Sequence, residues 1–383
     1  MKTILKMIGG FLIGISVGLT GAYIVLYLTK DMSLSVFLGK FANASMWEMF
    51  GVPLLAIVFM IFSTFLQIIL HEGGHLVCGL LTGYRFVSFR IFNQTLIRQD
   101  GRMRIKRFNI AGTGGQCLLV PPERPLAEIP YKLYNAGGVL ANLLTAMIAI
   151  ALIVAVSGIP KLLLLFLIMF ALVGILLALI NGIPMRMNGI GNDADNMRQL
   201  NKNRQSKLAL VMQLHVNARV QEGMRPCEMP ATWFEWDVEI DYKDALQVNY
   251  RQMCIGYLMD KEEWEASYYA LEDMMKHKDE IIGMLCNEIG CELLFTALVT
   301  GRTERAEELC TKQLLTYIKQ YRKVMSSKQR LLCIIALYRE KNPARAKDIY
   351  EAVCRRQAKY LMQGEVRSDI ALMRSVLTKE KVL

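Results

Sequence analysis

The chain has 383 residues, 53% of them hydrophobic, and its mean hydropathy is +0.29. This balance is unusual for a soluble globular protein, and the length suggests two or three domains. The formal net charge of +11 would suit a nucleic-acid-binding protein. We exclude that class, because much of the excess lies beside hydrophobic runs, where Lys and Arg orient membrane proteins, and no nucleic-acid motif accompanies it.

The composition changes near Met185. Long uncharged runs fill residues 1–185, whereas the rest of the chain has the alternation of apolar and charged residues that is typical of soluble helices. A membrane part followed by a soluble part is therefore predicted. The nine cysteines, most of them in the soluble part, include no CxxC pair, which indicates reduced thiols in a reducing compartment.

Four stretches are long and apolar enough to cross a bilayer, which requires roughly 20 residues of helix. They run over about 8–28, 50–70, 133–156 and 162–183. A turn containing Gly158 and Pro160 separates the last two, so we expect an antiparallel hairpin. The first stretch is long for a signal peptide and no small-residue cleavage site follows it, which favours a retained helix within an N-terminal unit of residues 1–49.

The charges of the short loops give an orientation. Residues 83–132 contain nine Lys and Arg residues but only three acids, so this loop is expected on the cytoplasmic side. Four spans then place both termini in the cytoplasm. We expect a multi-pass protein of the cell membrane, with a compact layout that is typical of bacteria.

A metal-binding pattern, His71-Glu72-Gly73-Gly74-His75, stands at the inner end of the second predicted span. On a helix, two histidines four residues apart project from the same face, so both imidazoles can bind one zinc ion. In this pattern Glu72 does not bind the metal but accepts a proton from the attacking water. Ionisable residues at the end of a span are costly and usually functional.

Two histidines leave zinc short of a protein ligand. The other histidines, His215 and His277, lie in the soluble half among helical sequence. A carboxylate is the better candidate, and Asp193 and Asp195 follow the fourth predicted span, which returns to the same side as His71. Either aspartate could instead cap the helix that follows.

Three elements in this order resemble the site-2 protease family of intramembrane zinc metalloproteases. They are HEGGH at 71–75, Gly137-Gly138-Val139-Leu140-Ala141-Asn142-Leu143-Leu144 on the next span, and the Asn192-Asp193 pair after the span beyond. The resemblance covers a core of about residues 50–200. It implies Zn2+ as cofactor, Asp193 as the third ligand, and Asn142 and Gly138 as substrate-binding residues. The chain departs from the family pattern at Val139 and Ala194.

The basic loop predicts a β-hairpin. Residues 84–92 alternate in polarity, Asp100-Gly101 is a hairpin turn signal, and one face of the following segment carries Arg102, Arg104 and Lys106. Such strands could hold an extended substrate, as the resemblance implies, or could rest on anionic headgroups. Gly112 to Gly115 and Pro121-Pro122 are expected to form a flexible loop near the membrane, a candidate gate.

The soluble part, residues 201–383, predicts paired helices with a period of 40 residues. Ala266, Ala306 and Ala346 share this spacing, and each follows a probable turn. The pattern looks like tetratricopeptide-type repeats, although the period is longer than the usual 34 residues. Such arrays often bind proteins or peptides, but this one could also serve only to stabilise the enzyme.

The sequence thus predicts a mainly α fold: a polytopic membrane core of about four spans, a small cytoplasmic β-hairpin or sheet, and a C-terminal α-helical repeat domain. The expected function is a membrane-embedded zinc metalloendopeptidase that cleaves membrane-associated or transmembrane proteins near the cytoplasmic face, with Glu72 as general base. The alternative is an inactive membrane scaffold that recruits partner proteins through its repeats. The lipid bilayer is a partner in either reading.

Overall fold

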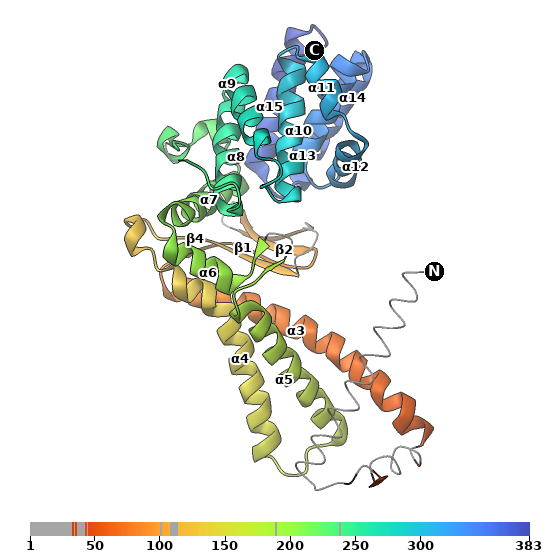
Figure 1. The fold of residues 1–383 in the computed structure, drawn as a ribbon. Helices are drawn as coiled ribbons and strands as arrows, with labels where there is room; N and C mark the ends of the chain where they lie inside the picture. The colour runs from red at the N-terminus through yellow and green to blue at the C-terminus, as the bar shows by residue number, and fades with distance from the viewer. Residues whose placement is uncertain are drawn as a thin grey trace.

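The computed structural model describes residues 33, 35–36, 43, 45–99, 102–107, 114–187, 190–236 and 239–383. Apolar helices form one end of the molecule, a small sheet lies in the middle, and the C-terminal helices form the other end (Figure 1). The fold is mainly α, as predicted. The first predicted span, 8–28, and most of the loop after it lie outside the described residues.

In the described part of the chain four strands follow the first long helix, and helices make up most of the rest. The α-helices are α3 (Val52–Leu81), α4 (Tyr131–Ala155), α5 (Lys161–Gly182), α6 (Asp193–Lys202), α7 (Arg204–Glu222), α8 (Ala245–Asp260), α9 (Trp264–Lys276), α10 (Gly283–Val299), α11 (Thr303–Leu309), α12 (Lys312–Tyr321), α13 (Ser326–Ile334), α14 (Pro343–Arg356) and α15 (Gln363–Lys379). The strands are β1 (Arg85–Ile91), β2 (Gln94–Gln99), β3 (Arg102–Arg107), β4 (Gly115–Val120), β5 (Arg186–Met187) and β6 (Ile190–Gly191). Short π-helical segments precede α3 (Trp47–Gly51) and follow α13 (Ile335–Arg339).

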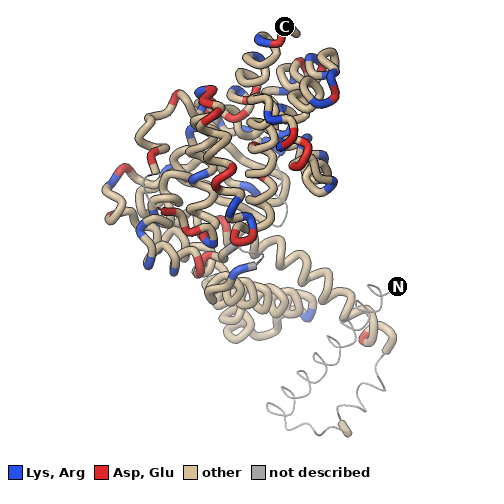
Figure 2. The backbone as a smooth tube through the Cα atoms, turned by 45° about the horizontal axis from the view of Figure 1, so that its top comes forward, with Lys and Arg blue, Asp and Glu red and all other residues tan. Residues whose placement is uncertain are grey.

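Among the described residues, three helical segments are long and apolar enough to cross a membrane: Trp47–Leu81, Leu126–Ala155 and Lys161–Gly182. They correspond to the second, third and fourth predicted spans. Large apolar side chains cover their outer surfaces, and Figure 2 shows almost no charged residue along them. In water such a surface would be an aggregation site, so these helices are suited to a lipid environment.

The first of these helices is longer than predicted. The apolar pattern suggested a span ending near Leu70, but α3 continues without a break through His71 and His75 to Leu81. Two glycines would weaken an isolated helix here, by about 1 kcal/mol each. Packing against α4 supports this turn instead, because Gly74 and Gly137 let the two helices approach closely: a Cβ on Gly74 would lie 2.2 Å from the Gly137 carbonyl oxygen.

The four-stranded sheet has the order β3-β2-β1-β4 and all its pairs are antiparallel. The pairing of Gln99 with Arg102 confirms the predicted hairpin. The prediction of a flexible loop was wrong for Gly115, which begins strand β4 (Gly115–Val120) beside β1. The reason is burial: Leu119 is fully buried and Cys117 nearly so, between the sheet and the helices α3 and α7.

The C-terminal helices form three helix–turn–helix pairs: α8 with α9, α10 with α11, and α13 with α14. Each turn holds one residue with positive φ, namely Glu262, Gly301 and Lys341, and these are 39 and 40 residues apart. A left-handed residue ends a helix by turning the chain so that a later amide caps the last carbonyls. The 40-residue period thus corresponds to a recurring backbone motif.

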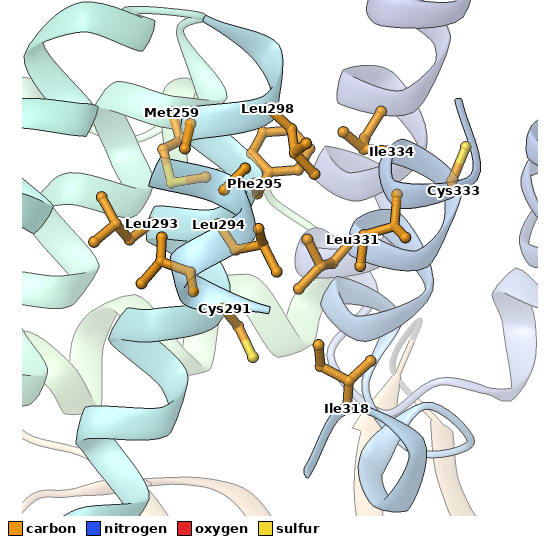
Figure 3. Close-up of a cluster of buried hydrophobic side chains, with 14 of the residues drawn as sticks. Met259, Cys291, Leu293, Leu294, Phe295, Leu298, Ile318, Leu331, Cys333 and Ile334 are labelled. Carbon is orange, nitrogen blue, oxygen red and sulfur yellow. The ribbon is translucent and has the colours of Figure 1, made fainter. Parts of the chain in front are cut away.

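The core between these pairs is apolar and well packed. Leu294, Phe295 and Leu298 of α10 face Leu331 and Ile334 across the gap to α13, and all five are buried (Figure 3). The small residues predicted to allow close packing behave differently from one another. Ala306 and Ala346 are buried, as expected, but Ala266 is exposed, because α9 lies at the open end of the array and no earlier pair covers it.

The contact between α3 and α4 gives a matched test. Replacement of Gly74 by alanine should lower stability by about 1–3 kcal/mol, the usual cost of overpacking, because its methyl group would strike the α4 backbone. Gly73→Ala is the control, since nothing lies within 4 Å of a Cβ placed there. Thermal unfolding in detergent measures both. Equal unfolding temperatures for the two variants would contradict the close helix contact.

Candidate metal centre

His71 and His75 lie one helical turn apart on α3, with their Nε2 atoms 3.2 Å from each other. The outer nitrogen of each ring has a fixed partner. His75 Nδ1 is 2.7 Å from the carbonyl oxygen of Tyr134, and His71 Nδ1 is 2.7 Å from Oδ1 of Asn142. Both partners come from α4, so the α3–α4 contact orients both imidazoles.

These partners determine which nitrogen carries the proton in each neutral ring. The Tyr134 carbonyl can only accept, so His75 Nδ1 donates. The amide nitrogen of Asn142 donates to the main-chain carbonyl of Gln67 over 2.9 Å and to the Gln67 side chain over 2.7 Å. Oδ1 of Asn142 is therefore the atom that faces His71, and His71 Nδ1 donates as well. Both Nε2 atoms are left with an unprotonated lone pair.

Asp193 completes the cluster from a distant part of the sequence. It is the first residue of α6, and Asn192, which caps that helix, also donates from Nδ2 to the carbonyl oxygens of Ile180 and Ile183 at the end of α5. Oδ2 of Asp193 lies 3.1 Å from His71 Nε2 and 3.3 Å from His75 Nε2. Burial alone would raise the pKa of Asp193, but an imidazole that carries a proton on Nε2 outweighs burial and lowers that pKa to about 2.

Three electron-pair donors thus converge on one point, 3.1, 3.2 and 3.3 Å apart. Ligand atoms around a tetrahedral zinc ion, with bonds of about 2.05 Å, are about 3.3 Å apart. Oδ2 of Asp193 is also buried without a hydrogen-bond donor of suitable geometry. Only a proton or a metal cation can hold these atoms together, and the N2O donor set suits zinc with one position left open.

Glu72 lies beside this cluster, under the first residue of β4. A Cβ on Gly115 would stand 2.5 Å from Oε1 of Glu72, so only glycine lets the strand pass here. Arg90, which is 1% exposed, holds the start of the strand by donating to the carbonyl oxygens of Phe92 and Gly115. In the described part of the chain the Glu72 carboxylate forms no hydrogen bond and no ion pair.

The two residues predicted to bind substrate lie against His71 instead of in an open groove. Asn142 is fully buried and hydrogen-bonded to the ring, and a Cβ on Gly138 would lie 2.4 Å from its Cε1 atom. Both residues position the His71 ring, and a contact with substrate stays a prediction. Sequence reasoning missed Gln67, the Tyr134 carbonyl and Gly115, none of which carries a motif.

The remaining candidate ligands have other partners. Asp195 pairs with Arg186 over 2.8 Å. His215 packs against the ring of Trp233, and His277 stacks on Tyr242. Cys117 is the cysteine on β4; burial raises the pKa of its thiol to about 12, and its sulfur is not among the donor atoms that converge with His71, His75 and Asp193. Of the two aspartates left open by the sequence, only Asp193 reaches the histidines.

Comparisons of the chain with protein-family models, with curated proteins and with solved structures found no match.

Zinc content distinguishes the two aspartates. The purified protein should hold one zinc per chain, and His71→Ala or Asp193→Asn should lose it, because each removes one of three ligands. Asp195→Asn should retain the metal, since that side chain pairs with Arg186. Elemental analysis of protein dialysed against a weak chelator measures this. Loss of zinc in Asp195→Asn together with retention in Asp193→Asn would reverse the assignment.

The hydrogen bond to His71 predicts a role for Asn142 in metal affinity. Asn142→Ala should weaken zinc binding by about 10- to 100-fold, as is usual when the partner of a ligating histidine is lost. Asn135→Ala is the matched control, because that buried amide lies on the same helix but bonds only to the carbonyl of Tyr131. Competition with a chromogenic chelator gives both affinities, and equal effects would show that His71 does not need this partner.

Proposed function

We propose that this protein is a membrane-embedded zinc metalloendopeptidase of the site-2 protease type. The observation that carries the proposal is the convergence of two imidazole lone pairs and one carboxylate on a single point, with Glu72 next to them and bound to nothing else in the described structure. Three electron-pair donors with no proton between them repel one another, so a cluster with a purely structural role would not bring them together.

Each residue has a distinct role in peptide hydrolysis. His71, His75 and Asp193 hold the metal. When zinc is bound, the site gains a Lewis acid that polarises a carbonyl group and makes water more acidic. Glu72 accepts a proton from the attacking water and returns it to the amine nitrogen as the carbon–nitrogen bond breaks. Asn142 and the Tyr134 carbonyl keep both rings in the tautomer that this requires.

The site lies near one end of an apolar helix, which favours substrates in or beside the bilayer. His71 is 19 residues from the start of α3, or about 29 Å along the axis, which is close to the thickness of a hydrocarbon core. Membrane-anchored proteins or transmembrane peptides are therefore the proposed substrates. The orientation with both termini in the cytoplasm stays part of the proposal and rests on the basic loop.

The sheet supplies a route for an extended substrate. Strand β4 is an edge strand, and its first residue lies against Glu72. A substrate segment added at this edge would be unwound and presented near the metal. The other reading of the hairpin, as a headgroup contact, is less favoured, because Lys106 of β3 donates to the carbonyl of Tyr360 in the C-terminal part.

The general base gives the decisive test of activity. Glu72→Gln should retain zinc and folding but lower cleavage of transmembrane peptides by about 100- to 10,000-fold, the usual contribution of such a group. The assay uses zinc-loaded protein in lipid nanodiscs, a set of transmembrane peptides labelled at both ends, and mass spectrometry to locate the cut.

Glu128→Gln is the control, because that glutamate is exposed on the loop before α4 and should not change the rate. Equal cleavage by Glu72→Gln and the wild type would eliminate the proposed base. Zinc-loaded wild-type protein that cuts none of the peptides would favour the alternative, an inactive scaffold that recruits partners through its C-terminal helices.

A further inference from the structure

A second candidate site lies far from the metal, inside the C-terminal helices. A cavity of about 500 Å³ opens between α7, α8, α10, α12, α13 and α15. Its size falls in the range of ligand pockets. The first helix of each pair, α8, α10 and α13, contributes to its wall, and α7, α12 and α15 supply much of the rest.

The walls are mainly apolar and adaptable. Methionines predominate among the apolar side chains: Met253, Met259, Met284, Met325 and Met362. Methionine is flexible and polarisable, and surfaces rich in it accept apolar ligands of varied shape. Gly256 lies in the α8 wall, and nothing is within 4 Å of a Cβ placed there, so the space in front of it is open.

One end of the cavity carries more negative than positive charge. Four acids, Glu288, Glu292, Glu365 and Asp369, gather around two bases, Lys328 and Arg330, which leaves two negative charges in excess when all are ionised. Three of the acids are matched. Glu288 pairs with Lys328 over 2.6 Å, Arg330 lies 3.1 Å from Asp369, and Glu292 pairs with Arg330.

Glu365 is the exception. It lines the cavity, and in the described part of the chain its carboxylate forms no hydrogen bond and no ion pair. Burial and repulsion from Asp369, Glu288 and Glu292 raise its pKa, while Lys328 lowers it. A carboxylate buried without a partner is costly, and a cation that entered the cavity would remove that cost.

Two amide side chains add a further type of contact. Asn217 on α7 and Gln252 on α8 line the cavity, are partly exposed, and make no hydrogen bond within the described structure. An amide can donate and accept at once, which matches the main chain of a peptide. The two free amides therefore favour an apolar cation with a peptide main chain over a simple apolar amine.

We propose that this cavity binds a short apolar peptide that carries one positive charge, with the charged group against Glu365 and the apolar side chains against the methionine-rich wall. The site is separate from the metal centre, and its occupancy does not depend on whether the protein cleaves peptides.

Three N-acetylated, fluorescein-labelled pentapeptides test this, each made of leucine with a central lysine, glutamine or glutamate. Binding is measured by fluorescence anisotropy to the full chain in nanodiscs, in the Glu72→Gln background so that cleavage cannot change the probe. Empty nanodiscs correct for partition into lipid. The lysine peptide should bind most tightly and the glutamate peptide most weakly.

Two variants locate the binding. Glu365→Gln should weaken the lysine peptide by about 10- to 100-fold, the usual value of a hydrogen bond to a charged group, and leave the glutamine peptide unchanged. Gly256→Leu should abolish binding of both by filling the open space, while helix propensity favours its folding. The controls are Glu304→Gln, an exposed acid on α11, and Gly283→Leu, at a second open glycine outside the cavity lining.

The outcomes separate cleanly. Equal affinity of the Glu72→Gln protein for the lysine and glutamate peptides, or no binding of either, overturns the proposal. An unchanged affinity for the lysine peptide when either Glu365→Gln or Gly256→Leu is added to that background, in protein shown by thermal unfolding to be folded, also overturns it. Because every measurement uses the Glu72→Gln protein, a failure here leaves the proposed hydrolase untouched, and the reverse holds as well.

Discussion

The candidate metal centre depends on the close approach of three electron lone pairs that repel one another. His71 Nε2, His75 Nε2 and Asp193 Oδ2 are all acceptors once the outer nitrogens of the rings are occupied, and acceptors 3.1–3.3 Å apart repel one another. Packing and hydrogen bonds from neighbouring helices must therefore hold these three side chains in place. They do so from α4, through the amide of Asn142 and the carbonyl of Tyr134, and from α5, through the cap at Asn192.

Close helix packing is what makes these contacts reachable. Gly74 and Gly137 bring α3 and α4 together, and Gly138 removes the one side chain that would displace the His71 ring. The fully buried Gln67 then connects all three apolar helices, because it accepts from Asn142 and donates to the carbonyl of Phe170. In an apolar environment a polar network stabilises the fold only if each member is hydrogen-bonded. Gln67, Asn142 and His71 all meet this condition.

The sequence predicted the parts of this protein that depend on local pattern. Apolar runs located three described helices, an i, i+4 histidine pair located the ligand face, and Asp100-Gly101 located the hairpin. It left Asp193 and Asp195 open, because which carboxylate turns inward depends on how Asn192, the N-cap of α6, is hydrogen-bonded to the end of α5. It missed β4 as well, since glycines favour a flexible loop, whereas Gly115 instead lets the strand pass over Glu72.

Helix α7 contacts both the C-terminal cavity and the apolar cluster beneath the sheet. Val216 and Val220 face the cavity, whereas Leu214 packs with Leu119 in the cluster beneath the sheet. Leu119 in turn fills the notch at Gly79 of α3, one turn beyond His75, where a Cβ would lie only 2.2 Å from its Cδ1 atom. Packed interiors transmit displacement because they have little free volume. A peptide that moved α7 would therefore have to move β4, which lies against Glu72, or α3, which carries it.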